Sequence, residues 1–266
     1  NINLDIENIS NKINLNIIAY NVHGLENKHF HHSFFEYIEK HEIFILIETH
    51  VESKNFFKFD NRFKNYNTLW KSAGRISRFG RGIGGSVCGV RKDLAEIGIR
   101  HSFKRYEELD IINLKTQNEE FEIIPAYLRG ANWHQDFEQL VNRFESDPIN
   151  PIIIGDLNIR IGEEQQNLEE ILFETFPYGL EERNSMDKTT NSNGRKYLEF
   201  CSNYGLVIAN GRTVGDEEGC FTFINSNGNS VNDICTVSIE VLKYIERFEV
   251  EEQIWSDHFP IKLKLS

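Results

Sequence analysis

The chain has 266 residues, of which 39% are hydrophobic and 12% aromatic. This composition supplies a sizeable core and excludes an intrinsically disordered chain, and no apolar run approaches the roughly 20 residues that a membrane-spanning helix needs. The formal net charge is −12, and an acidic balance of this size argues by itself against nucleic acid as a partner.

Strand-like segments recur along the whole chain. The apolar runs predict strands at residues 15–20, 43–47, 84–90, 110–115, 121–127, 152–154, 206–209, 220–224, 231–237, 245–250 and 260–265. Apolar residues at helical spacing predict helices at residues 32–40, 135–144 and 194–204. Because strands outnumber helices, we expect a four-layer α/β sandwich, in which two mixed or mostly antiparallel sheets pack face to face with helices outside. Since no repeat or Pro-rich linker interrupts the pattern, we expect one domain over residues 1–266.

The cysteines and the first residue bear on the setting of the protein. The four cysteines, at positions 88, 201, 220 and 235, form no Cys-x-x-Cys pair and no zinc-ligand spacing. A disulfide framework is not expected at this density, so a reduced, intracellular setting is favoured. The chain starts at Asn1 rather than Met, and we expect a piece of a longer protein.

Several predicted strands end in, or are followed by, side chains suited to metal or phosphate chemistry. These residues, in chain order, are Asn21, Glu48, Asp156, Asn158, Asp233, Asp257 and His258. Residues at strand ends lie in loops held by a rigid scaffold, where catalytic groups concentrate.

The residue types in this pattern favour one chemistry. Mg²⁺ and Mn²⁺ prefer oxygen ligands, and His258 titrates near neutral pH. Such a set suits cleavage of a phosphodiester, whose transition state gathers negative charge. Each element alone has an ordinary alternative, because a Gly-Asp or Asp-His pair is commonly a turn and Asp233 can simply end a strand. The order and spacing together favour function.

That order resembles the endonuclease/exonuclease/phosphatase superfamily, which has the fold of deoxyribonuclease I. The resemblance covers about residues 16–265 and rests on I-I-A-Y-N-V-H-G-L, I-L-I-E-T-H, P-A-Y-L-R-G, I-I-I-G-D-L-N, S-V-N-D and W-S-D-H-F-P-I. Within the superfamily, G-D-L-N-I-R-I-G, N-W-H-Q-D-F-E-Q-L and G-R-K-Y-L-E-F-C resemble the apurinic-like endonuclease domain of non-LTR retrotransposons. Such a domain nicks double-stranded target DNA in the nucleus and leaves a 3′-hydroxyl that primes reverse transcription. The resemblance thus implies fusion to a reverse transcriptase, with no membrane partner and a monomeric isolated domain.

The resemblance also implies roles for individual residues. Glu48 would be the main carboxylate for Mg²⁺ or Mn²⁺, with Asn21 adjoining it as part of the catalytic set and Asp257 near the metal. Thr222 and Ser230 fall in the region that such domains use near DNA.

The resemblance implies the remaining catalytic roles as well. Asp156 would orient or activate the attacking water, and Asn158 would position the water or the phosphate. Tyr127 would contact the scissile phosphate. Asp233 would orient His258, which would stabilise the phosphate or assist proton transfer.

Departures from the family pattern leave alternatives open. His23 stands where abasic-site enzymes carry Asp, which argues against abasic-site repair but does not exclude it. Inositol 5-phosphatases carry Trp-Cys-Asp-Arg where this chain has Ser-Val-Asn-Asp, which counts against a phosphatase; a sphingomyelinase is a further phosphoesterase of this fold. If the chain were an inactive DNA-binding module, we would expect the acidic residues of the site to be replaced, yet Glu48, Asp156, Asp233 and Asp257 are present.

The positive charge of the chain is concentrated in one stretch. Residues 58–105 hold 12 of the 29 Lys and Arg but only 3 of the 41 acids. Lys71, Arg75, Arg78 and Arg81 fall in a Gly- and Ser-containing segment that predicts a loop. This loop is either solvated or a contact surface for the DNA backbone.

Overall fold

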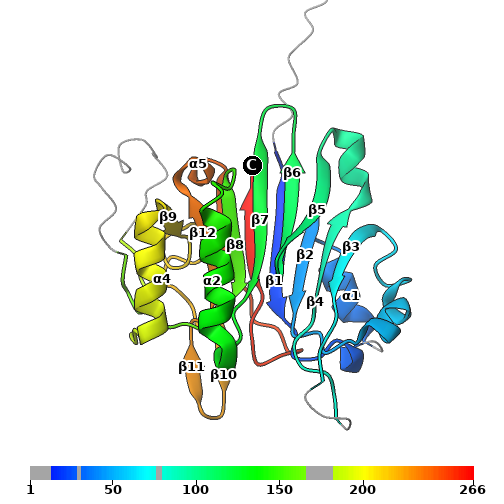
Figure 1. Ribbon diagram of the computed structural model, residues 1–266, viewed down its shortest axis with the longest axis horizontal. Coiled ribbons are helices and arrows are strands. Elements are labelled where there is room, and N and C mark those ends of the chain that lie inside the picture. The colour runs from blue at the N-terminus through cyan, green and yellow to red at the C-terminus, as the bar shows by residue number, and fades with distance from the viewer. Residues whose placement is uncertain (1–12, 29–30, 76–79, 166–181) are drawn as a thin grey trace, which may run out of the picture.

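Two six-stranded sheets form the centre of the computed structural model, which describes residues 13–28, 31–75, 80–165 and 182–266 (Figure 1). The first sheet has the order β13-β14-β1-β2-β4-β3. Its strands are β1 (Leu15–Asn21), β2 (Ile43–Ile47), β3 (Tyr66–Lys71), β4 (Ser86–Arg91), β13 (Ile245–Val250) and β14 (Ile261–Leu265). The β1–β2 pair is parallel, and the other pairs are antiparallel.

The second sheet repeats this plan with the order β5-β6-β7-β8-β12-β9. Its strands are β5 (Arg100–Tyr106), β6 (Leu109–Lys115), β7 (Glu120–Tyr127), β8 (Pro151–Asp156), β9 (Leu206–Ile208) and β12 (Asp233–Ser238). The central β7–β8 pair is parallel, and the other pairs are antiparallel. A short hairpin of β10 (Phe223–Asn225) and β11 (Gly228–Ser230) projects beyond the end of this sheet (Figure 1).

Helices cover the outer faces of both sheets. Helix α1 (His32–Ile38) and the 3-10 segment Ser53–Phe59 pack on the first sheet, and α2 (Trp133–Phe144) and α4 (Ser192–Asn203) pack on the second. Figure 1 shows α2 and α4 on one side of the molecule and α1 on the other. A four-residue helix, α5 (Ile239–Leu242), follows β12. Among the described residues, no helix is long and apolar enough to cross a membrane.

Three apolar clusters account for the layers. In β1, Ile17 and Ala19 face the cluster between the sheets, whereas Ile18 and Tyr20 face the cluster under α1. In β8, Ile152 and Ile154 belong to the cluster between the sheets and Ile153 to the one under α2 and α4. Strands buried on both faces have unbroken apolar sequences, which is why they were predictable. The expected four-layer α/β sandwich is confirmed.

Three strands, β3, β5 and β11, were not predicted, and one predicted strand was wrong. Strands β3 and β5 lie at sheet edges, and β5 alternates exposed with half-buried residues, so neither has an apolar run. The predicted strand at 220–224 is replaced by the hairpin, because β10 begins only at Phe223. The two edge strands become strands through their pairing with β4 and β6, a contact that local sequence does not show.

Candidate active site

The functional side chains gather at one rim because of strand direction. Parallel strands β1 and β2 end at this rim, as do β7 and β8, while the antiparallel β12 and β14 start there. Tyr127, Asp156 and Asp233 stand opposite one another on three neighbouring strands. Asn21 ends β1, and Glu48 follows β2 directly.

The backbone at this rim is held in uncommon conformations. Gly155 has a φ of 144°, and a Cβ there would stand 2.2 Å from the carbonyl oxygen of Ala126, so only glycine lets β8 approach β7 beside Asp156. His23, Glu48, His50 and Asn158 are four of the eight described non-glycine residues with positive φ. Such conformations cost free energy and concentrate at functional sites.

Asp156 lies at the centre of a buried hydrogen-bond network. Its Oδ2 accepts a hydrogen bond from Asn21 Nδ2 at 2.9 Å, and its Oδ1 accepts one from the backbone N–H of Asn158 at 3.0 Å. The Asn158 amide in turn donates to the carbonyl of Leu128 at 2.9 Å. Asp156 and Asn21 are each only 1% exposed, so the carboxylate has a fixed orientation.

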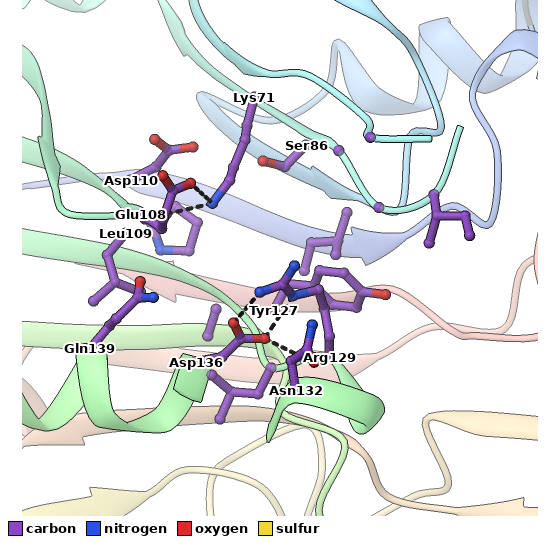
Figure 2. Close-up of a pocket in the computed structure, with 18 of the residues that line it drawn as sticks. Lys71, Ser86, Glu108, Leu109, Asp110, Tyr127, Arg129, Asn132, Asp136 and Gln139 are labelled. Atoms are coloured by element: carbon purple, nitrogen blue, oxygen red, sulfur yellow. Dashed lines mark hydrogen bonds and ion pairs between the residues drawn. The ribbon is translucent and has the colours of Figure 1, made fainter. Parts of the chain in front are cut away.

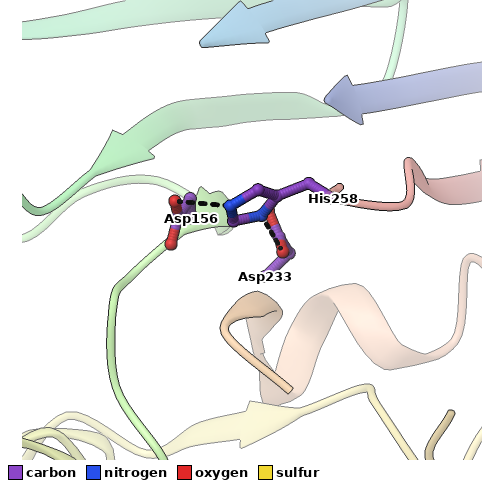
Figure 3. A group of neighbouring side chains, drawn as sticks. All are labelled: Asp156, Asp233 and His258. Atoms are coloured by element: carbon purple, nitrogen blue, oxygen red, sulfur yellow. Dashed lines mark hydrogen bonds and ion pairs between the residues drawn. The ribbon is translucent and has the colours of Figure 1, made fainter. Parts of the chain in front are cut away.

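His258 lies between two carboxylates (Figure 3). Its Nδ1 is 2.9 Å from Asp233 Oδ2, and its Nε2 is 3.9 Å from Asp156 Oδ2. All three side chains are buried. The short contact to Asp233 orients the ring so that Nε2 faces Asp156.

Burial and charge shift the pKa values of this group. Burial, and then the charge of Asp233, raise the pKa of Asp156 above its ordinary value. Burial alone would lower the pKa of His258, but the charge and hydrogen bond of Asp233 and the charge of Asp156 outweigh it and raise that pKa. Opposite charges at short range favour the charged form of each partner, which is the expected state of His258 here.

Glu48 forms a second network beside the first. Its Oε1 accepts a 2.6 Å hydrogen bond from the Tyr127 hydroxyl, and its Oε2 lies 3.5 Å from His50 Nε2. Burial would raise the pKa of Glu48, but hydrogen bonds from His50, Tyr127 and Asn21 lower it to about 2. Burial, followed by the bond to Glu48, raises the pKa of Tyr127. Glu48 is therefore an anion, and Tyr127 is a neutral donor to it.

Asp257 connects to the rest of the rim through His23. Its Oδ1 lies 3.3 Å from His23 Nδ1, and the other ring nitrogen of His23 lies 3.2 Å from Arg81 Nη2. The backbone N–H of His23 donates to Asn21 Oδ1 at 3.1 Å. The structure thus brings Asp257 next to the Asn21 loop.

The remaining polar residues predicted near DNA are placed differently. Thr222 is fully buried, and its hydroxyl accepts the backbone N–H groups of Asn232 and Asp233, each at 3.0 Å. Its side chain therefore holds the start of β12 and does not reach the surface, a correction to the expected DNA contact. Ser230, at the end of the hairpin, is 8% exposed.

The basic residues of the predicted loop are engaged with acids or histidine. Lys71 is the last residue of β3 rather than a loop residue, and its Nζ lies 2.9 Å from Glu108 Oε2 (Figure 2). Arg75 forms an ion pair with Glu52. Arg81 contacts His23, and Arg78 lies outside the described residues.

The rim offers oxygen donors for a metal ion. The ligand atoms of Asp156, Asp233 and His258 lie within 4.8 Å of one another, close enough for a single ion, but His258 could coordinate it only as a neutral imidazole. Glu48 adds an anionic carboxylate with a side chain 22% exposed. Carboxylate oxygens are the ligands that Mg²⁺ and Mn²⁺ prefer.

Sequence reasoning gave no role to two residues that the structure places at the site. His50 contacts Glu48, and its ring packs edge-on against His23 at 5.7 Å between centroids. Asn210 donates to the carbonyl of Asp233 and accepts from the backbone of Cys235, so it anchors β12. His50 stands two residues after Glu48, a spacing that could have suggested it, whereas nothing in the sequence indicated Asn210.

The architecture is a deoxyribonuclease I-like α/β sandwich, the fold that the motifs predicted. The endonuclease domain of TRAS1, a telomere-specific non-LTR retrotransposon, is similar with a TM-score of 0.62 and 14% identity, over 95% of this chain and 98% of that one. A 3′-5′ exonuclease (NExo) from Neisseria meningitidis is similar with a TM-score of 0.62 and 14% identity, over 94% of this chain and 99% of that one. The AP endonuclease LMAP from Leishmania major is similar with a TM-score of 0.67 and 13% identity, over 95% of this chain and 87% of that one.

No family model matches the sequence, and no curated protein matches it. At 13–14% identity the structural likeness establishes the fold alone.

Proposed function

We propose that this protein is a divalent-metal-dependent DNA endonuclease that hydrolyses a phosphodiester bond and leaves a 3′-hydroxyl. The arrangement around Asp156 carries the proposal, because a buried carboxylate held by Asn21 and Asn158 faces a histidine that Asp233 orients. The similar solved structures, which include an endonuclease domain and an AP endonuclease, support DNA as the substrate.

The residues divide the chemistry between them. Asp156 accepts the proton of a water whose oxygen forms a bond to phosphorus, while the bond from phosphorus to the 3′ oxygen breaks and that oxygen takes up a proton from solvent water to become the 3′-hydroxyl. The raised pKa of Asp156 makes it a stronger base than an exposed carboxylate. His258, held as an imidazolium between Asp233 and Asp156, places positive charge where the phosphate gains negative charge. The Asn158 side chain and the Tyr127 hydroxyl stand at the same rim to position the phosphate.

A divalent cation fits the donors of this rim. Glu48 would hold it, with the Asn21 amide oxygen and Asp257 beside it, because Glu48 is ionised and partly open to solvent. When bound, Mg²⁺ or Mn²⁺ supplies charge that stabilises the phosphate transition state.

The likeness to the retrotransposon domain supports a finer proposal. The chain would nick double-stranded target DNA in the nucleus to prime reverse transcription, as one domain fused to a reverse transcriptase. His23, which occupies the position of an Asp in abasic-site enzymes and is tied to Asp257, favours nicking of intact DNA over repair.

Cleavage of supercoiled plasmid tests the proposal. With Mg²⁺ we expect nicked circles whose ends a DNA polymerase can extend, and we expect no nicking when EDTA removes the metal. A duplex with one abasic site and a soluble inositol phosphate are run alongside. Cutting confined to the abasic duplex would assign repair instead, release of phosphate from the inositol compound would assign a phosphatase, and binding without cleavage would indicate an inactive module.

Removal of loop charge tests the predicted DNA surface. We expect Arg75→Ala combined with Arg78→Ala to weaken DNA binding and to reduce the steepness of its salt dependence by about one to two in a plot of log K against log [salt]. Fluorescence anisotropy with a labelled duplex, in EDTA, measures both. Arg195→Ala, which removes an exposed charge on α4, is the matched control. An unchanged slope in the double variant would remove this loop from the DNA-binding surface.

A further inference from the structure

Two arginines, Arg183 and Arg212, are buried in the loops beside β9, the edge strand of the second sheet (Figure 1). They are only 1% and 2% exposed, and the mechanism proposed above uses neither of them. Arginine is almost never buried to this extent without a partner, because its charge has to leave water. The pair therefore needs negative charge inside the protein.

Backbone carbonyls of one turn accept some of the arginine N–H groups. Arg183 Nη1 donates to the carbonyl of Gly162 at 2.6 Å and to that of Glu164 at 3.0 Å. Arg212 Nη2 donates to the carbonyl of Gln165. Since Glu164 and Gln165 are consecutive residues, the two guanidinium groups meet at the same turn.

Arg183 has a buried carboxylate nearby. The charge of Asp216, which is 2% exposed, raises the pKa of Arg183 against the larger, lowering effect of burial. Two further acids act on Arg183 in the same direction, but each has an ion pair of its own, Glu163 with Lys188 and Asp187 with Arg160. Asp216 is therefore the charge partner that balances Arg183.

Arg212 has no acidic partner in the part of the chain that the structure describes. Its Nε and Nη1 are buried and make no hydrogen bond with any described residue. Burial, and then the charge of Arg183, lower the pKa of Arg212 to about 10, so that its side chain is still a cation at neutral pH. A buried cation beside a second cation is unfavourable unless an anion lies with them.

Ser185 supplies another buried donor. Residues 182–186 alternate between exposed and buried, so the side chains of Arg183 and Ser185 lie on the same, inward face of this segment. The Ser185 hydroxyl has no hydrogen-bond partner among the described residues. A Cβ at Gly211 would stand 1.8 Å from the carbonyl oxygen of Asn184, so the segment packs tightly against the loop that carries Arg212. The unused donors thus face the protein interior.

We propose that Arg212, Arg183 and Ser185 bind one small monovalent inorganic anion of the halide class, for which chloride is the probe. The anion accepts hydrogen bonds from the Arg212 guanidinium and the Ser185 hydroxyl, and it offsets the one positive charge that Asp216 leaves unbalanced. A monovalent ion suits a site closed to solvent better than phosphate or sulfate, because the cost of dehydration rises steeply with ionic charge.

The bound anion would stabilise the loop that follows β8. This loop runs from Asp156 to the turn at residues 162–165, where the two arginines hold the carbonyls. The side chain of Gln165 continues the contact to β9, since it donates to the carbonyl of Leu206 and accepts the backbone N–H of Ile208, each at 2.8 Å. The inference is independent of the proposed nuclease function.

Thermal unfolding at constant ionic strength tests the proposal, with sodium chloride exchanged stepwise for sodium gluconate. Gluconate has the same charge but is too large for a buried site. We expect the unfolding temperature to rise with chloride along a saturable curve, by about 5 °C once chloride is about 100-fold above its half-saturating concentration. In crystals soaked in sodium bromide, we expect an anomalous-scattering peak within hydrogen-bond distance of Arg212.

Three variants assign the effect to the cluster. Arg212→Met keeps a long side chain but removes the charge, and we expect it to lose the chloride dependence and the bromide peak. Ser185→Ala removes only a hydroxyl, and we expect its half-saturating chloride concentration to rise about 10-fold. Arg195→Met, which replaces an exposed arginine on α4, is the matched control and keeps the full response.

Equal unfolding temperatures in chloride and gluconate would overturn the proposal, as would a bromide peak found only elsewhere on the protein. A chloride response that is unchanged in both Arg212→Met and Ser185→Ala would do the same. If Arg212→Met does not fold, the shift in Ser185→Ala and the position of bromide in the wild-type protein decide the question. DNA cleavage is not measured in this test, so failure of the proposed nuclease would leave its result intact.

Discussion

Asp156→Asn is expected to lower the rate of plasmid nicking by about 1,000-fold. The substitution keeps the size of a side chain that is 1% exposed but removes the carboxylate that accepts the proton of water. The folded protein should persist, because burial and the charge of Asp233 already disfavour the anion of Asp156, and an uncharged amide avoids that cost. Nicking rate and thermal unfolding, measured on the same preparation, separate the two effects.

Asp147→Asn is the matched control for this substitution. Asp147 is an exposed carboxylate after α2, at the opposite end of β8 from Asp156, and its positive φ suits Asn equally well. We expect its nicking rate to equal that of the wild type. If Asp156→Asn kept more than a tenth of the wild-type rate, Asp156 would not be the base.

The second large effect concerns the pH dependence of cleavage. The raised pKa of His258 means that the imidazolium persists to a higher pH than an ordinary histidine, and activity that depends on it is lost only as pH rises through that raised pKa. Asp233→Asn removes the partner that contributes most to the increase. We therefore expect the alkaline limb of the pH–rate profile to move to lower pH by at least about one unit.

Asp216→Asn provides a control for loss of a buried carboxylate. Asp216 accepts backbone hydrogen bonds from Gly211 and Cys220 and has no contact with His258. Its replacement is expected to lower the unfolding temperature without moving the alkaline limb. A limb that stays in place in Asp233→Asn would mean that His258 does not act as an imidazolium.

Much of the fold was predictable because its central strands are buried on both faces. The five apolar residues of β2, for example, are too few for a buried helix and suit a strand in the middle of a sheet, and the same holds for Ile152–Ile154 in β8. The edge strand β5 was missed because its neighbour β6, rather than its own residues, makes it a strand. The hairpin was missed because β10 and β11 have three residues each, most of them exposed, so no apolar run marks either strand.

The sequence by itself determined which residue types are available for chemistry and where each follows a strand. Glu48, Asp156 and His258 were predicted from their positions at strand ends, their residue types and the order of the motifs, and their roles remain proposals that the experiments above test. Charge counting, by contrast, placed Lys71 and Arg75 in a loop that was either solvated or a contact surface for the DNA backbone. The structure pairs them with Glu108 and Glu52.

Only the tertiary structure decided which of these groups meet. Strand order places Tyr127, Asp156 and Asp233 opposite one another, and the start of β14 brings His258 between two of them, although it lies 102 residues from Asp156 in the chain. Local sequence specifies a strand and its end, but hydrogen-bond distances and pKa shifts depend on contacts between segments, and packing alone sets these.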